Sequence, residues 1–289
     1  MKPRGLRAFI NDAKTAMLLA TLTGLFIVVG AAIGPRWILP MFIMGAAMNV
    51  GAWFFSHKIA IASMRARELT PETGGALYRM IDRLRRNAGL PMPRVYISPQ
   101  QAPNAFATGR SPRKAAVCFT QGAIDLLDPD ELEGVAAHEL AHIKNHDTLI
   151  STVAATVSGV LAMLAQYGLF LGLGRREGSN PLVMIAVIMI AAVGAAVIKA
   201  MISRSREFEA DADGAAIAGS PDGLMSALGK LDALSRRVPM QQPNPAMNNL
   251  FIVEPLASNL RGGNPLTRLF ATHPPTEQRL AALNRLRQG

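Results

Sequence analysis

The sequence predicts a mainly α-helical integral membrane protein with two transmembrane hairpins, four spans in all, and a polar part that contains a small β-meander. Half of the 289 residues are apolar, and they are gathered into uninterrupted blocks. Such blocks are typical of a membrane protein rather than of one large soluble core. The lone cysteine, Cys118, rules out an internal disulfide, and its apolar surroundings in the sequence predict a small buried side chain.

The first predicted hairpin comprises residues 15–33 and 37–56, two uncharged blocks joined by the tight turn Gly34-Pro35-Arg36. Each block is long enough to cross a bilayer. Trp37 and Trp53 fall near the ends of the second block, where interfacial aromatic residues belong. A cleaved signal peptide is the alternative for the first block, but this block is longer than the usual apolar region of a signal, and a second block follows almost at once. We therefore expect the hairpin to be retained.

The second predicted hairpin lies between residues 148 and 198. Residues 148–174 carry no charge, residues 175–178 form a charged loop, and residues 182–198 are again apolar. The last block is short for a span, so a buried hairpin in a soluble domain is the alternative. We expect the block to span the membrane.

The net charge of +10 raises the alternative of a nucleic-acid-binding protein. Many of the basic residues, however, flank the first hairpin: Lys2, Arg4, Arg7 and Lys14 precede it, and Lys58, Arg65 and Arg67 follow it. This placement fits the positive-inside rule better than a basic groove interleaved with aromatic residues. We therefore expect no nucleic-acid partner, and we expect the polar segments at both ends of the hairpin to lie in the cytoplasm.

The polar segments predict both strands and helices. Three strands are expected, punctuated by Pro, Gly and Asn, over residues 94–98, 104–108 and 115–120. Thr70 and Pro71 are expected to open a helix that ends at Gly89. Asp128-Pro129-Asp130-Glu131 predicts a strong helix start with a capping box. Further helices are expected over residues 203–217, over residues 221–236 and after Pro275.

The helix that begins near Asp128 carries the sequence His138-Glu139-Leu140-Ala141-His142. Histidines four residues apart project from one face of a helix, so both imidazoles can reach one tetrahedral zinc ion. Glu139 then lies beside the metal, where its carboxylate can take the proton of a zinc-activated water. The alternative is a helix surface with two hydrogen-bonded histidines. Charged residues on both sides of the motif, which give water access, favour the metal site.

A third ligand is available in the acidic cluster of residues 207–213. Catalytic zinc sites use three protein ligands and leave a fourth position for water. Glu207 and Asp211 share one helix face, and Glu209 and Asp213 share another. One pair can therefore supply a ligand and an acid that orients a zinc-bound histidine. Spacing alone does not decide between the two pairs.

Several motifs in this order resemble the HtpX heat-shock proteases, bacterial relatives of the CAAX prenyl proteases. The resemblance covers nearly the whole chain. It is carried by the apolar N-terminal hairpin and by Asn104-Ala105-Phe106-Ala107-Thr108-Gly109, Asp130-Glu131-Leu132 before the zinc motif, Ile143-Lys144-Asn145-His146-Asp147 after it, Ser205-Arg206-Glu207-Phe208-Glu209-Ala210-Asp211, and His273-Pro274-Pro275-Thr276-Glu277. The resemblance implies a zincin-like catalytic domain and a zinc-dependent endopeptidase of the bacterial inner membrane. Such an enzyme would hydrolyse misfolded or damaged membrane proteins through zinc-activated water, with Glu139 as general base.

The resemblance also implies roles for single residues. The ligands of one Zn2+ per chain are implied to be His138, His142 and Glu207. Asp211 is implied as the acid that orients a ligand. Asn104 is implied to lie in an edge strand that pairs with an extended substrate. His273 is implied to bind the substrate or the oxyanion, with a structural histidine at a helix start as the alternative.

The ligands also constrain the topology, because they must lie on one side of the membrane. The chain between His142 and Glu207 must then cross an even number of times, and two apolar blocks satisfy this condition. We expect a transmembrane hairpin over residues 1–56, catalytic parts over 57–147 and 199–289, and a second hairpin over 148–198. The active site is expected to face the cytoplasm. The expected partners are protein substrates, the lipid bilayer and other membrane proteases that share the task.

Two other classes of protein compete with this interpretation. The first is an intramembrane protease of the site-2 type, which would add an Asp-Gly signature, and Pro221-Asp222-Gly223 superficially offers one. In site-2 proteases, however, the zinc motif is buried within a span, whereas in this sequence charged residues flank the motif. A zinc-binding scaffold or transporter without catalysis would place ionisable residues inside the spans, and the predicted spans carry none.

Overall fold

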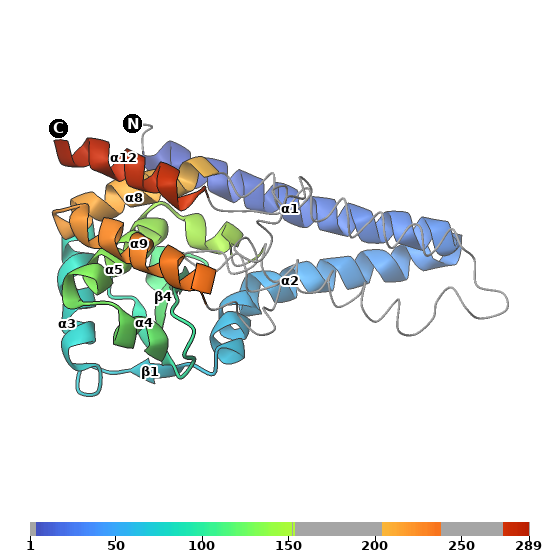
Figure 1. The fold of residues 1–289 in the computed structure, drawn as a ribbon. Coiled ribbons are helices and arrows are strands. Elements are labelled where there is room, and N and C mark those ends of the chain that lie inside the picture. The colour runs from blue at the N-terminus through green and yellow to red at the C-terminus, as the bar shows by residue number, and fades with distance from the viewer. Residues whose placement is uncertain (1–3, 152, 154–203, 238–273, 289) are drawn as a thin grey trace.

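Figure 1 shows an antiparallel helical hairpin that projects from a body of helices built around one small sheet. This computed structural model describes residues 4–151, 153, 204–237 and 274–288. The predicted second hairpin, residues 148–198, lies almost wholly outside the described residues, and His273 lies outside them too. The four spans therefore stay a prediction.

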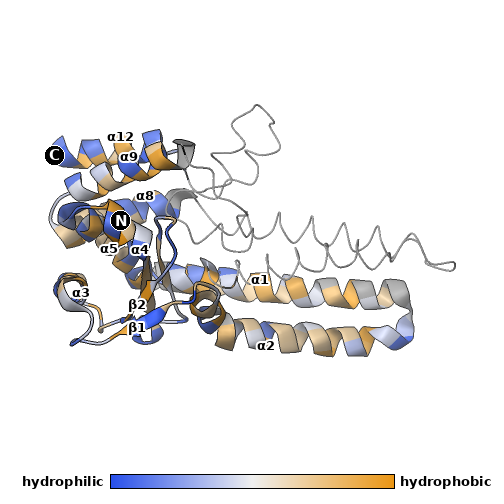
Figure 2. Cartoon of the chain, turned by 60° about the horizontal axis from the view of Figure 1, so that its bottom comes forward, coloured by the Kyte–Doolittle hydropathy of each residue, from blue (hydrophilic) through white to orange (hydrophobic). Residues whose placement is uncertain are grey.

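The hairpin is formed by α1 (Arg4–Ile33), the short 3-10 helix η1 (Pro35–Trp37) and α2 (Ile38–Ser63). The predicted span over residues 15–33 lies in α1. Leu39, Ile43 and Val50 are among the exposed apolar residues of α2. Figure 2 shows that hydrophobic residues make up much of this helix. By length and hydropathy, one segment in the described part of the chain qualifies as a candidate membrane span, and it is Pro35–Phe55.

The sheet has four strands in the order β1 (Arg67–Leu69), β2 (Arg94–Ser98), β4 (Ala116–Thr120) and β3 (Ala105–Thr108). The three predicted strands are present within one residue of their expected ends, and β1 was not predicted. The predicted meander is wrong, because β4 pairs in parallel with β2, and β3 pairs with the far side of β4. The physical reason is the path of the chain: β3 and its flanking residues carry the chain back between β2 and β4, so these two strands run in the same direction and β3 takes the edge.

The described helices of the body are α3 (Gly75–Ala88), α4 (Gln121–Leu126), α5 (Pro129–Lys144), α8 (Arg204–Ala218), α9 (Asp222–Arg237) and α12 (Thr276–Gln288). Of these, α3 begins later than predicted. Thr70 and Pro71 belong to a turn in which the Thr70 N–H donates to Thr73 Oγ1, and the helix starts only after Gly74. The helix ends at Gly89 as predicted, where a φ of +68° is the left-handed conformation that glycine favours.

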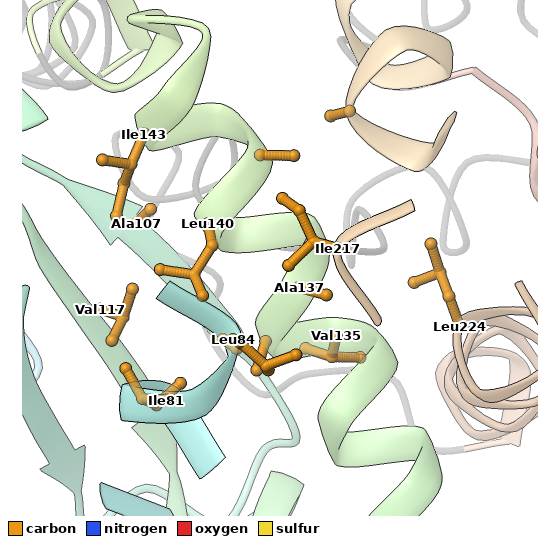
Figure 3. Packing of buried hydrophobic residues seen from close by; sticks show 14 of the residues in the cluster. Ile81, Leu84, Ala107, Val117, Val135, Ala137, Leu140, Ile143, Ile217 and Leu224 are labelled. Atoms are coloured by element: carbon orange, nitrogen blue, oxygen red, sulfur yellow. The ribbon is translucent and has the colours of Figure 1, made fainter. Parts of the chain in front are cut away.

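Helix α5 runs through the middle of the core. It begins with the predicted capping box, in which the side chains of Asp128 and Glu131 each accept the other's backbone N–H at 3.0 Å. It packs against α3, β3, α8 and α9 through buried residues, among them Val135, Ala137 and Leu140 (Figure 3). A central helix packed on several sides holds the side chains that it carries in fixed positions.

Cys118 of β4 is fully buried, as expected. Burial raises the pKa of its thiol to about 12. The reactive thiolate is therefore scarce at neutral pH while the sheet is intact. Because it is the only cysteine in the sequence, its reactivity with a thiol reagent reports on the folding of the body.

Candidate metal centre

His138 and His142 project from one face of α5, as their spacing predicts. Their Nε2 atoms are 3.2 Å apart, and the ring planes are nearly perpendicular, with centroids 4.7 Å apart. The His138 side chain is buried, whereas that of His142 is 16 % exposed. The two Nε2 atoms therefore converge on one point beside the helix, and His142 is the less buried of the two residues.

Helix α8 packs against α5 and brings a carboxylate to the same point. Glu207 Oε2 is 3.8 Å from His138 Nε2, and Glu207 Oε1 is 3.6 Å from His142 Nε2. One possible ligand atom from each of the three residues lies within 4.8 Å of the other two. The two helices can approach this closely because Gly214 has no side chain. A Cβ at Gly214 would lie only 2.9 Å from the His138 Cα.

The acidic pair that faces the histidines contains Asp211, whose Oδ1 is 3.0 Å from His138 Nδ1. This contact has the distance of an ion pair but not the alignment of a hydrogen bond. The alternative pair points elsewhere. Glu209 is exposed, and Asp213 accepts a hydrogen bond from the Asn145 amide at 2.8 Å. The packing of α8 therefore brings Glu207 and Asp211, and not the other pair, to the histidines.

His142 has its own carboxylate partner, Asp147, to which sequence reasoning assigned no role. The ring Nδ1 and Asp147 Oδ2 are 3.1 Å apart and hydrogen-bonded. On an uninterrupted helix, a residue five positions further on would point about 140° away. The chain avoids this because α5 ends at Lys144 and His146 takes a left-handed conformation with φ +60°, which turns Asp147 back toward His142.

Arg279 is a second residue to which sequence reasoning assigned no role. Helix α12 carries its guanidinium into the site, where the side chain is 2 % exposed. Arg279 donates from Nη2 to Asp211 Oδ1 at 2.6 Å and from Nε to Asp211 Oδ2 at 2.9 Å, and its Nη1 is 3.7 Å from Glu207 Oε2. Burial alone would raise the pKa of Asp211, but the charge and hydrogen bonds of Arg279 lower it to about 2. Asp211 therefore stays ionised behind His138.

Glu139 is buried beside the two histidines and is 5 % exposed. Its carboxylate accepts a hydrogen bond from the backbone N–H of Ala107 in β3, which joins α5 to the edge of the sheet. Burial raises the pKa of the Glu139 carboxyl, against the opposing effect of His138 and His142. A carboxyl group with a raised pKa accepts and returns a proton near neutral pH more readily than an ordinary one does.

The donor set fits a zinc ion. Each Nδ1 faces a carboxylate, so a ring that is neutral, as a metal ligand must be, would carry its proton there and present a lone pair at Nε2. Two lone pairs 3.2 Å apart repel each other unless a cation lies between them. Burial would lower the pKa of His142, yet Asp147 and Glu207 raise it to about 9, which shows the same demand for positive charge. Two histidine nitrogens and a glutamate oxygen form one of the ligand sets of catalytic zinc.

Two further residues were predicted at the site. Asn104 is buried directly before β3, and its backbone N–H donates to Thr120 Oγ1 at 2.8 Å. Within the described sheet, β3 is an edge strand, as predicted. His273 lies outside the described residues, directly before the part that resumes at Pro274. The roles of Asn104 and His273 stay predictions.

Known proteins resemble this chain over most of its length. Residues 71–287 match the model of peptidase family M48. A "Protease HtpX homolog" of Desulfatibacillum aliphaticivorans is 47 % identical over 281 residues, which cover 94 % of this chain and 89 % of that protein. One of Pelotomaculum thermopropionicum is 44 % identical over 283 residues, which cover 95 % and 99 %. The crystal structure of S. mikatae Ste24p matches with a TM-score of 0.52 at 17 % identity, covering 96 % of this chain and 67 % of that one, which is a likeness of fold.

Proposed function

The chain belongs to peptidase family M48 and is a metalloprotease, and from that premise we propose that it is a zinc-dependent endopeptidase of the bacterial inner membrane. The observation that carries this proposal is the convergence of His138, His142 and Glu207 within 4.8 Å, with the buried Glu139 carboxylate beside the two histidines. The proposed substrates are misfolded or damaged membrane proteins, so that the enzyme serves protein quality control.

In this proposal His138, His142 and Glu207 hold one Zn2+. A bound zinc ion supplies Lewis-acid chemistry, because it polarises the carbonyl of the peptide bond and makes water a nucleophile near neutral pH. Glu139 accepts the proton of the attacking water and delivers it to the leaving amine. Asp211 keeps the His138 ring in place with its Nε2 directed toward the ligand point.

The edge strand β3 is the proposed docking place of the substrate backbone. An extended peptide can add to the edge of a sheet through main-chain hydrogen bonds. The contact between the Ala107 N–H and Glu139 supports this assignment, because it joins the strand to the proton acceptor. Asn104 would then hold the start of the strand. His273, directly before α12, is proposed to contact the substrate or the oxyanion.

Two features of the hairpin support the proposed membrane location. The first is its exposed apolar surface, and the second is the pairing of basic and aromatic side chains at its end near the sheet. The Arg110 guanidinium lies 5.0 Å from the ring centroid of Phe54, and the Lys58 ammonium lies 5.8 Å from that of Phe55. Basic and aromatic side chains of this kind are typical of the boundary between the apolar layer and the headgroups.

The proposed topology has hairpins over residues 1–56 and 148–198 and catalytic parts over residues 57–147 and 199–289. Basic residues on both flanks of the first hairpin support a cytoplasmic active site. The enzyme would then share its substrates with other membrane proteases, without a nucleic-acid partner.

The proposed mechanism is tested with Glu139→Gln in the full chain, purified in detergent. The variant should retain one zinc per chain by elemental analysis, because Glu139 is not a proposed ligand. Its cleavage of casein, an unfolded protein, should fall by about 10²–10⁴-fold because the proton acceptor is lost. Undiminished cleavage by Glu139→Gln would refute the mechanism.

Two further variants on α8 complete the comparison. Glu207→Gln removes a proposed ligand and should lose zinc as well as activity. Glu209→Gln changes an exposed carboxylate two residues away and should keep both. Equal zinc content in all three variants would contradict the assignment of Glu207.

A further inference from the structure

The N-terminal helix reaches the metal centre through one buried side chain. Asn11 of α1 is 7 % exposed, and its Nδ2 donates to Asp147 Oδ1 at 2.8 Å and to the Asn145 carbonyl at 3.2 Å. These bonds join residues 136 and 134 positions apart in the sequence. Because Asp147 is bonded in turn to His142, the amide of Asn11 lies two hydrogen bonds away from the imidazole of a proposed ligand.

Both oxygens of the Asp147 carboxylate are engaged. Oδ2 holds the His142 ring, while Oδ1 accepts from Asn11 and lies 3.9 Å from Arg206 Nη1. A carboxylate held at both oxygens is hindered from rotating, so the imidazole bonded to it is held as well. The second bond of Asn11, to the Asn145 carbonyl, fixes the turn that brings Asp147 back toward the histidine.

Apolar packing alone does not require an amide at this position. Further along α1, Leu18 and Leu22 pack against Leu149, Ile150 and Val153, and these contacts already join α1 to the chain after Asp147. A buried amide without hydrogen-bond partners is destabilising, so Asn11 is tolerated because its donors are used. Both donors are directed at the segment that holds His142.

We propose that Asn11 is a positioning residue of the metal centre, by which α1 completes the support of His142. The inference rests on the proposed function, because it requires His142 to be a metal ligand. It gives the N-terminal hairpin a role besides membrane attachment: the docking of α1 and the retention of the metal depend on each other.

The test uses the full chain in detergent, loaded with Co2+ as a spectroscopic probe. Asn11→Asp keeps the shape of the side chain but replaces the donor that faces Asp147 with a carboxylate oxygen. Chelator-driven loss of Co2+ should be faster by about tenfold or more, in line with other residues that orient metal ligands. The visible absorption of bound Co2+ should change too, because the His142 ring is no longer held.

A matched control and a rescue separate positioning from general damage. Asn49→Asp makes the same change in α2, where the Asn49 amide donates to the Leu19 carbonyl and to Thr23 Oγ1, away from the site. This control should release Co2+ at the wild-type rate. The double variant Asn11→Asp with Asp147→Asn reverses donor and acceptor, since the new amide donates to position 11 and its carbonyl accepts from His142. It should recover most of the lost retention.

Each outcome has a distinct meaning. If the wild type takes up no Co2+, the proposed function fails. If the wild type takes up one Co2+ and Asn11→Asp releases it at the wild-type rate with an unchanged spectrum, only the inference about Asn11 fails. If Cys118 reacts with a thiol reagent in Asn11→Asp, that variant is unfolded, and the uncharged Asn11→Ala takes its place. Release of Co2+ from Asn11→Ala at the wild-type rate then overturns the proposal.

Discussion

Arg279 is a buried cation that faces two carboxylates and a histidine. Besides its bonds to Asp211 and its contact with Glu207, its Nη2 lies 3.5 Å from His138 Nε2. Burial disfavours the guanidinium charge, but the carboxylates hold the pKa of Arg279 above its usual value. Removal of one partner from such a buried group leaves the other charge without compensation. Arg279 therefore matters to the stability of the body as well as to the site.

We predict that Arg279→Met lowers the free energy of unfolding by about 3–5 kcal/mol. Arg279→Lys should lose less, because it keeps the charge but not the forked pair of donors. Urea-induced exposure of the Cys118 thiol measures both. The control is Arg287→Ala on the same helix, whose exposed ion pair with Asp222 should contribute less than about 1 kcal/mol. Similar losses for Arg279→Met and Arg287→Ala would contradict the prediction.

Single residues of the site differed in how far the sequence could predict them. The position of His138 and His142 at one point follows from helical periodicity alone. The choice of Glu207 over Glu209 needed either a family resemblance or the packing of α8. Asp147 was out of reach, because its contact depends on a left-handed residue that no spacing rule anticipates. Arg279 was out of reach because its contact depends on how distant helices pack.

The close packing of α9 against α5 depends on a glycine, Gly134 of α5. A Cβ at Gly134 of α5 would lie 2.3 Å from the Leu224 backbone nitrogen and 2.7 Å from the Gly223 carbonyl carbon. Backbone atoms cannot move aside as a flexible side chain can. The two helices approach this closely only because Gly134 has no side chain.

We predict that Gly134→Ala forces α9 away from α5 and costs about 1–3 kcal/mol of stability, as overpacking in a core does. The control is Gly229→Ala within α9, where an added Cβ meets nothing within 4 Å. That variant should be neutral or stabilise the protein by about 0.5–1 kcal/mol, because alanine favours the helix. Urea titration followed by Cys118 labelling measures both, and equal midpoints for the two variants would be inconsistent with the close approach.

At the level of elements, the sequence predicted local structure better than assembly. Helix starts with a side-chain cap, such as Asp128, and helix ends with glycine, such as Gly89, were predicted because these signals act within a few residues. Strand β1 was missed because three residues, two of them charged, carry too little pattern. The order of the strands was wrong because local pattern does not tell which strands pair: all residues of β3 and of β4 are buried, yet one strand is at the edge and the other is central.

At the scale of the whole molecule, the described residues form an apolar hairpin attached to a body that carries the proposed ligands (Figures 1 and 2). If the hairpin crosses the membrane, the turn at its tip and the helices of the body lie on opposite sides. Arg36 is exposed at that turn, and Arg79 is exposed on α3. The proposed orientation places Arg36 outside the cell and Arg79 in the cytoplasm.

We predict that a cysteine introduced by Arg36→Cys, in a Cys118→Ala background, reacts with a membrane-impermeant maleimide applied to intact spheroplasts. A cysteine introduced by Arg79→Cys should react only after the spheroplasts are lysed. The positive-inside rule gives the reason, because the basic flanks of the hairpin stay in the cytoplasm. Labelling of both positions from the outside would contradict the topology, and so would labelling of neither.

The residues that meet at the metal centre are spread from Asn11 to Arg279, and this spread has a consequence for synthesis on the ribosome. A growing chain contains both histidines long before Glu207 has been translated, and it contains Glu207 long before Arg279. The donor set is therefore incomplete during most of translation, and the guanidinium that compensates its carboxylates arrives last of all. A chain that stalls midway carries the proposed ligands apart, and a chain that stops before α12 lacks the guanidinium that pairs with Asp211 and Glu207.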